Sequence, residues 1–251
     1  VVDGYIRNAD VWIETTKDFS NIGETKTSSN LQGRFSLSTN LTDYRVQSSG
    51  GIDLDTNNSL EGLILINHKI DELASSNTAQ NFIISPLTTA DFFLSESLNK
   101  LTNPISTTIN DLLGLDKNFN VNTVDHIASL NDGFMYAEAY ERANQLTSLS
   151  LSFTRLVNNL STSDINSSEI FQVILDRMVA IYQSSQNEVN IESSAFIDAL
   201  VDDVNLKFSL SLESEIKTKV KNMYKAFIPL IQVKPNLAAT HGLFYFATNT
   251  F

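Results

Sequence analysis

The period of the hydrophobic pattern changes along the chain, and this change constrains the fold more than any other feature. Up to about residue 67 the apolar residues come in short runs, and residues 34–38 alternate between polar and apolar, as in a half-buried strand. From about residue 85 they recur at the spacing of an amphipathic helix. The pattern predicts an α+β protein: a small antiparallel β-sandwich domain at residues 1–68, then a mainly α-helical domain at residues 85–251.

Turn and capping residues give the expected elements their bounds. Strands are expected at residues 2–6, 9–13, 34–38, 44–47 and 60–66, with turns at Gly23, Gly33 and Gly50–Gly51. Helices are expected from Thr88 or Thr89 to Leu98, from Asn103–Pro104 to Gly114, and over residues 134–160, 168–182, 193–208 and 211–231. The apolar run at residues 243–246 predicts a last strand, whose edge would invite pairing with a neighbouring chain.

Composition excludes several classes of protein. At 42% hydrophobic residues the chain can bury a core, and none of its apolar runs approaches the ~20 residues of a membrane span. The absence of cysteine removes disulfides, zinc–thiolate sites and thiol catalysis. A net charge of −12 repels phosphate backbones, so nucleic acid is not an expected partner.

A set of short motifs occurs in order over the first 115 residues. They are the segment from Val2 to Ile6, the segment from Ala9 to Glu14, Gly23–Glu24–Thr25, residues 27–35 with Gly33, Gly50–Gly51–Ile52–Asp53, and Ser85–Pro86–Leu87–Thr88–Thr89. Together they resemble the transthyretin-like, carboxypeptidase-regulatory-type β-sandwich found in large bacterial exported and surface proteins. The resemblance implies an accessory, adhesive or structural module. It implies no reaction.

Two acidic segments are candidate calcium sites, because calcium takes six to eight oxygen ligands, several of them carboxylates. The candidate ligands are Glu14, Asp18, Asn21 and Glu24 in the first loop, and Asp53 and Asp55 in the second. Lys17 and Phe19 interrupt the first loop, which favours a solvated loop without metal. The second begins like an EF-hand loop but then has Asn58 and Ile64 where Gly and Glu are required, so a polar strand face is the alternative.

The residues that could carry catalysis do not form a complete set, and we expect no enzyme activity. Ser97 and Lys100 match the S-x-x-K pattern of acyl-transfer enzymes, but the companion motifs are missing. The three histidines, His68, His126 and His241, are far apart in sequence. The carboxylates Asp198, Asp202 and Asp203 are expected to form a solvated helix face or an acidic binding face.

The sequence therefore favours a structural or adhesive module of the cell exterior that acts through contacts with other protein chains, including copies of itself. One form of this hypothesis is a self-assembling subunit of a surface layer or filament. The first residues lack the regions of a signal peptide, which leaves two alternatives: a cytosolic protein, or a mature or excised piece of a longer protein. The missing initiator Met favours the second. The alternative is an accessory module that binds a sugar or peptide, with Trp12 as a stacking surface. The orientation of Trp12 distinguishes the two hypotheses. A side chain that points inward belongs to a core, whereas one that points outward beside a cleft indicates ligand binding.

Overall fold

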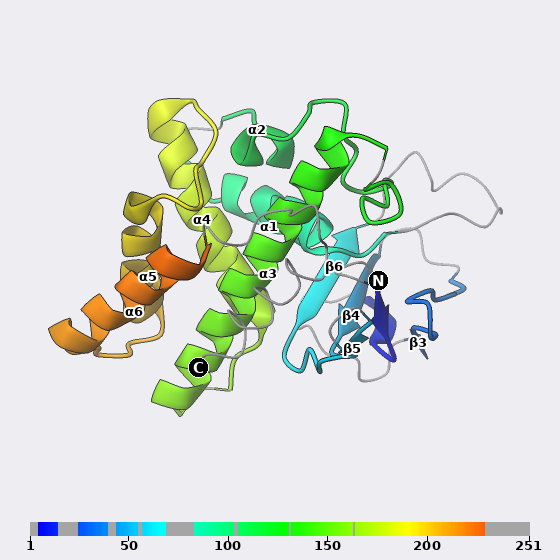
Figure 1. The fold of residues 1–251 in the computed structure, drawn as a ribbon, viewed down its shortest axis with the longest axis horizontal. Coiled ribbons are helices and arrows are strands. Elements are labelled where there is room, and N and C mark those ends of the chain that lie inside the picture. Colours follow the sequence, from blue (N-terminus) through cyan, green and yellow to red (C-terminus); the bar gives the residue numbers. More distant parts are fainter. Residues whose placement is uncertain are drawn as a thin grey trace.

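The computed structural model describes residues 5–14, 25–39, 44–54, 57–68, 83–102, 105–130, 132–162 and 164–228. Within them the strands come first and the helices follow, which confirms the predicted α+β class. The strands gather on one side of the molecule and the helices on the other (Figure 1). The expected strand at residues 243–246 and the expected helix start at Asn103–Pro104 lie outside the described residues.

The strands form two antiparallel sheets. The larger has the order β3-β2-β4-β6, with bounds Lys26–Ser28, Asp10–Glu14, Arg45–Ser49 and Ile64–His68. The smaller pairs β1 (Ile6–Arg7) with β5 (Ile52–Asp53). Strands at residues 9–13 and 44–47 were expected, and β2 and β4 confirm them to within two residues at either end.

The prediction of a strand over residues 34–38 is wrong. Phe35 and Leu37 are half-buried against the core and their neighbours are exposed, so the alternation of side chains is real. Residues 35–38 belong to no strand, and Arg34 is held in a local turn with Asn30: the Arg34 carbonyl accepts a hydrogen bond from Asn30 N–H, and the Asn30 side chain accepts one from Arg34 N–H. Asparagine commonly captures nearby backbone groups in this way, in competition with a strand ladder.

The outer edge of β6 is covered by hydroxyl groups from the first turns of two helices. The Ile64 N–H donates to Ser167 Oγ at 2.7 Å, and the Ile66 N–H donates to Thr89 Oγ1 at 2.8 Å. The Ile66 carbonyl accepts from Thr88 Oγ1 at 2.6 Å. Because an uncovered strand edge is a template for wrong pairing, these contacts close the sheet on this side and fix it to the helices.

Six helices follow in the described residues: α1 (Pro86–Leu98), α2 (Ile109–Leu113), α3 (Phe134–Leu160), α4 (Ser167–Ser185), α5 (Ser194–Lys207) and α6 (Ser214–Phe227). Helix α3 begins and ends at the residues that the apolar spacing predicted, Phe134 and Leu160. Gly114 ends α2 in the left-handed conformation, as expected of a C-terminal glycine. None of the helices in this part of the chain is long and apolar enough to cross a lipid bilayer.

Three helices begin at other residues than the sequence indicated. The helix expected from Asn103–Pro104 does not include residues 105–108, and α2 begins at Ile109, where the Thr108 side chain caps it. α1 is capped by Ser85, and Thr88 completes the capping box as its third residue instead of starting the helix. α6 begins at Ser214 and not at Ser211, because Ser211 has a positive φ of 53° and so cannot lie in a right-handed helix.

The sheets and the helices share one hydrophobic core. One cluster of packed, buried side chains includes residues from every part of the described chain, from Ile6 in β1 to Ile228 just after α6. α3 packs against α1 and α4, and α1 also packs against β6. This core includes residues of both predicted domains, residues 1–68 and residues 85–251. The division into two domains therefore stays a prediction.

Candidate functional site

Of the six candidate calcium ligands, Glu14 and Asp53 lie in the described residues; Asp18, Asn21, Glu24 and Asp55 lie outside them. Glu14 is the buried last residue of β2, directly opposite Arg45 in β4. Asp53 is buried in β5, and its backbone closes a tight turn with Asn57 and Asn58. Across the described ranges, no three His, Asp or Glu side chains come together as a metal centre. Calcium binding stays a prediction.

Ser97 and Lys100 meet at a carboxylate from another helix. Ser97 Oγ donates to Asp176 Oδ1 at 2.7 Å, and Lys100 Nζ lies 3.0 Å from Asp176 Oδ2. Gln172 Nε2 donates to both Ser97 Oγ and Asp176 Oδ1, each at 2.8 Å. Ser97 is buried. These bonds tie α1 to α4 and occupy the groups that the S-x-x-K pattern would use, so the geometry supports a structural role for this pair.

The carboxylates of α5 are matched by cations on both neighbouring helices. Asp203 forms a bidentate pair with Arg177 of α4, with both N···O distances at 2.6 Å. Asp202 lies 2.7 Å from Lys217 and 2.9 Å from Lys221 of α6. Burial tends to raise the pKa of Asp202, but the hydrogen bonds from these two lysines outweigh it and hold the pKa below its usual value. The acidic face is therefore a set of ties between α4, α5 and α6.

His126 is buried in a turn region before α3. Its ring lies 6.3 Å from that of Tyr140, and its Nε2 atom has no hydrogen-bond partner in the part of the chain described. The neighbouring Asp125 carboxylate accepts from Tyr5 OH and from the backbone N–H groups of Ile127 and Ala128. Burial lowers the pKa of His126 from 6.5 to about 4, although the charge of Asp125 acts in the opposite direction.

The buried His126 is expected to make the fold sensitive to mild acid. The unfolded chain takes up a proton on this imidazole near pH 6.5, whereas the folded chain does so only near pH 4. The stability that His126 contributes is therefore complete above pH 6.5 and is lost as the pH falls toward 4, by roughly 3 kcal/mol. Urea unfolding at pH values from 7 to 4 should show this loss in the wild type. His126→Gln should reduce the slope, and an unchanged slope in that variant would contradict the assignment.

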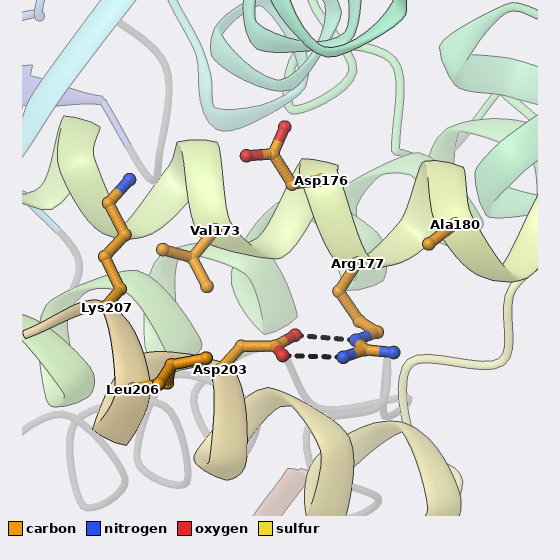
Figure 2. Close-up of a pocket in the computed structure, with 7 residues that line it drawn as sticks. All are labelled: Val173, Asp176, Arg177, Ala180, Asp203, Leu206 and Lys207. Atoms are coloured by element: carbon orange, nitrogen blue, oxygen red, sulfur yellow. Dashed lines mark hydrogen bonds and ion pairs between the residues drawn. The ribbon is translucent and has the colours of Figure 1, made fainter. Parts of the chain in front are cut away.

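Two neighbouring hollows lie along α4 and share Lys207 at the end of α5. The first, of about 330 Å³, is lined by Val173, Asp176, Arg177, Ala180, Asp203, Leu206 and Lys207 (Figure 2). The second, of about 280 Å³, is lined by Arg45, Phe92, Phe93, Glu96, Ser168, Glu169, Gln172 and Lys207. We call these two hollows together the α4 groove.

The walls of the α4 groove combine apolar side chains with fixed charges. Figure 2 shows Arg177 and Asp203 joined across the gap between α4 and α5, while Asp176 points to the opposite side of α4. Leu206 lines the groove and is 79% exposed. The groove can therefore offer an apolar contact beside charges whose positions are already set by ion pairs.

Sequence reasoning did not single out Leu206 or the groove, although one signal exists. The buried residues of α5 are Phe196, Ile197, Leu200, Val201 and Val204, which lie on one face of the helix. Leu206 is apolar but lies outside that face. An apolar residue on the face of an amphipathic helix that is expected to be polar is the signal that could have identified it. That α4 lies opposite Leu206 depends on how the helices pack, and the residues near Leu206 in sequence do not indicate it.

Comparison with known proteins gives no relatives: no family model matches the chain, and no curated protein or solved structure matches it significantly.

Proposed function

We propose that this chain is a structural or adhesive module of the cell exterior, without enzyme activity, which works by contact with other protein chains, including copies of itself. The observation that carries the proposal is the exposed Leu206 on the rim of the α4 groove. Together with Val173 and Ala180 in the wall of the hollow, Leu206 gives a partner chain apolar surface to bury. The proposed extracellular location is supported by the resemblance of the first 115 residues to β-sandwich modules of exported and surface proteins.

The position of Trp12 favours this proposal over the binding of a sugar or peptide between the two halves. Trp12 is only 2% exposed, so its ring cannot serve as an open stacking surface. A ligand-binding accessory module remains the alternative, and the α4 groove is where such a ligand would then bind.

Self-association is expected to increase with ionic strength. Copies with a net charge of −12 repel each other at low salt, and added salt or calcium screens that repulsion. In light scattering of the purified chain, the average mass should rise with salt and protein concentration. A Leu206→Glu variant should weaken the association about tenfold or more, because it places a further negative charge at the apolar contact.

The matched control is Leu31→Glu, since Leu31 is also largely exposed, at 63%, but lies on the loop after β3 and not in the groove. It should associate like the wild type. A wild-type chain that stays monomeric in concentrated solution with salt and calcium would contradict the proposal of self-association. Equal effects of the two variants would show that Leu206 is not the contact.

A further inference from the structure

Two apolar side chains are more exposed than the other large apolar residues in the described part of the chain. Phe134 is 81% exposed and Leu206 is 79% exposed. Single exposed apolar residues are ordinary on protein surfaces, so exposure alone decides nothing. The surroundings of the two differ, however. Leu206 lines a hollow, whereas Phe134 is the first residue of α3 and directly follows two exposed residues, Asp132 and Gly133.

The two side chains lie in different parts of the molecule. In Figure 1, α3 begins at the upper right of the view, whereas α5 and α6 lie at the left. α3 packs on α1 and α4, and α5 packs on α4 and α6. Phe134 therefore cannot cover Leu206 of its own chain, but two copies of the chain can bring these two surfaces together.

The start of α3 carries an excess of negative charge. Asp132 is exposed beside Phe134. Glu138, one turn further along the helix, is acted on by the charges of three other carboxylates, those of Glu141, Glu188 and Asp116. Burial raises the pKa of Glu138 and these carboxylates raise it further, although the charge of Arg142 acts in the opposite direction. Phe134 is thus an apolar projection beside a group of acidic side chains.

The α4 groove combines an apolar wall with a cation that lacks a carboxylate partner. The carboxylates in its walls are all engaged within the chain: Asp176 with Lys100, Asp203 with Arg177, Glu169 with the backbone N–H of Asn166, and Glu96 also. Lys207 follows Leu206 and lines both hollows. Among the described residues it pairs with no carboxylate, and its Nζ atom lies 5.9 Å from the centre of the Phe208 ring. In charge and in shape the groove therefore complements the start of α3.

We propose that the start of α3 in one copy docks in the α4 groove of another copy, with Phe134 against Leu206 and the acidic side chains facing Lys207. This inference rests on the self-association proposed above, and it names the surface that occupies the groove. The first hollow, of about 330 Å³, is at the lower limit of small-ligand pockets and so has room for an aromatic side chain.

Docking of this kind joins two different surfaces, so each added copy still presents one free groove and one free Phe134. Such a head-to-tail contact continues into open chains or closes into rings, whereas a symmetric contact stops at a dimer. In light scattering, the mass of the wild type should therefore rise beyond that of a dimer as the protein concentration increases.

Single substitutions test the two sides of the contact. Phe134→Ala should weaken self-association about tenfold or more, because it removes the aromatic side chain that fills the hollow. Lys207→Glu should also weaken it, because it reverses the charge that faces the carboxylates. The control is Leu160→Ala, since Leu160 ends the same helix and is 47% exposed. This variant should associate like the wild type.

A mixture of two blocked variants tests the head-to-tail arrangement. Phe134→Ala keeps its groove, and Leu206→Glu keeps its Phe134. Near the wild-type dissociation constant each should be monomeric alone, whereas an equal mixture should form dimers with one chain of each kind and nothing longer. If Phe134→Ala or Lys207→Glu associates like the wild type, or if the mixture gains no mass, the docking proposal is overturned while self-association through Leu206 stands. A wild type that stays monomeric contradicts both.

Discussion

Replacement of Gly51 by alanine is expected to lower the free energy of unfolding by about 3–5 kcal/mol, because two costs combine at this position. Gly51 has a φ of +94°, which side chains of L-residues rarely adopt. A Cβ atom there would also lie 2.5 Å from Ile6 Cγ2, 2.8 Å from the Arg7 carbonyl oxygen and 2.9 Å from Ala9 N. Two of these atoms belong to the backbone around β1 and β2, which can move only by disturbing both sheets. Chemical denaturation of the variant measures the loss.

The adjacent glycine provides a matched control. Gly50 has a φ of +62°, and no described atom lies within 4 Å of where its Cβ would be. Gly50→Ala carries the conformational cost without the clash, so we expect a loss of about 1 kcal/mol. Equal losses at the two positions would show that close approach of the backbones does not determine the requirement for Gly51.

The Gly50–Gly51 turn illustrates how far the sequence can be read. The pair predicts a turn, and the turn is present between β4 and β5. Which of the two glycines is indispensable depends on β1, about 45 residues earlier in the chain, and therefore on long-range pairing. Similarly, the alternation over residues 34–38 reports correctly which side chains are half-buried, but side-chain burial does not specify the hydrogen bonds of the backbone.

The helical part was more predictable, because its signals are local. The apolar spacing over residues 134–160 and the left-handed Gly114 depend on neighbours within a few residues, and both predictions are confirmed. The environment of Ser97 is the opposite case. Its partners Gln172 and Asp176 lie more than 70 residues later, so the S-x-x-K pattern alone could not distinguish a nucleophile from a tie between two helices.

Replacement of Phe153 by alanine is expected to cost about 3–5 kcal/mol and to loosen α6 more than the other helices. Phe153 in α3 is fully buried, and its ring stacks on that of Tyr224 at a centroid distance of 4.3 Å. Tyr224 and Val220 are the residues that α6 buries. Burial raises the pKa of Tyr224, so its hydroxyl stays neutral inside the core. A cavity beside Tyr224 therefore removes the main apolar attachment of α6, and hydrogen exchange should accelerate most in residues 214–227.

Phe134 is the matched control for this substitution, since it is the same residue type in the same helix but 81% exposed. Phe134→Ala should change the free energy of unfolding by no more than about 0.5 kcal/mol. The ion pairs from Asp202 and Asp198 to α6 remain intact in both variants. Surface pairs of this kind contribute only about 0–1 kcal/mol each, so they should not hold α6 in place once the aromatic contact is gone. If α6 keeps its wild-type protection in Phe153→Ala, the ion pairs, and not the stacked rings, attach this helix to the protein.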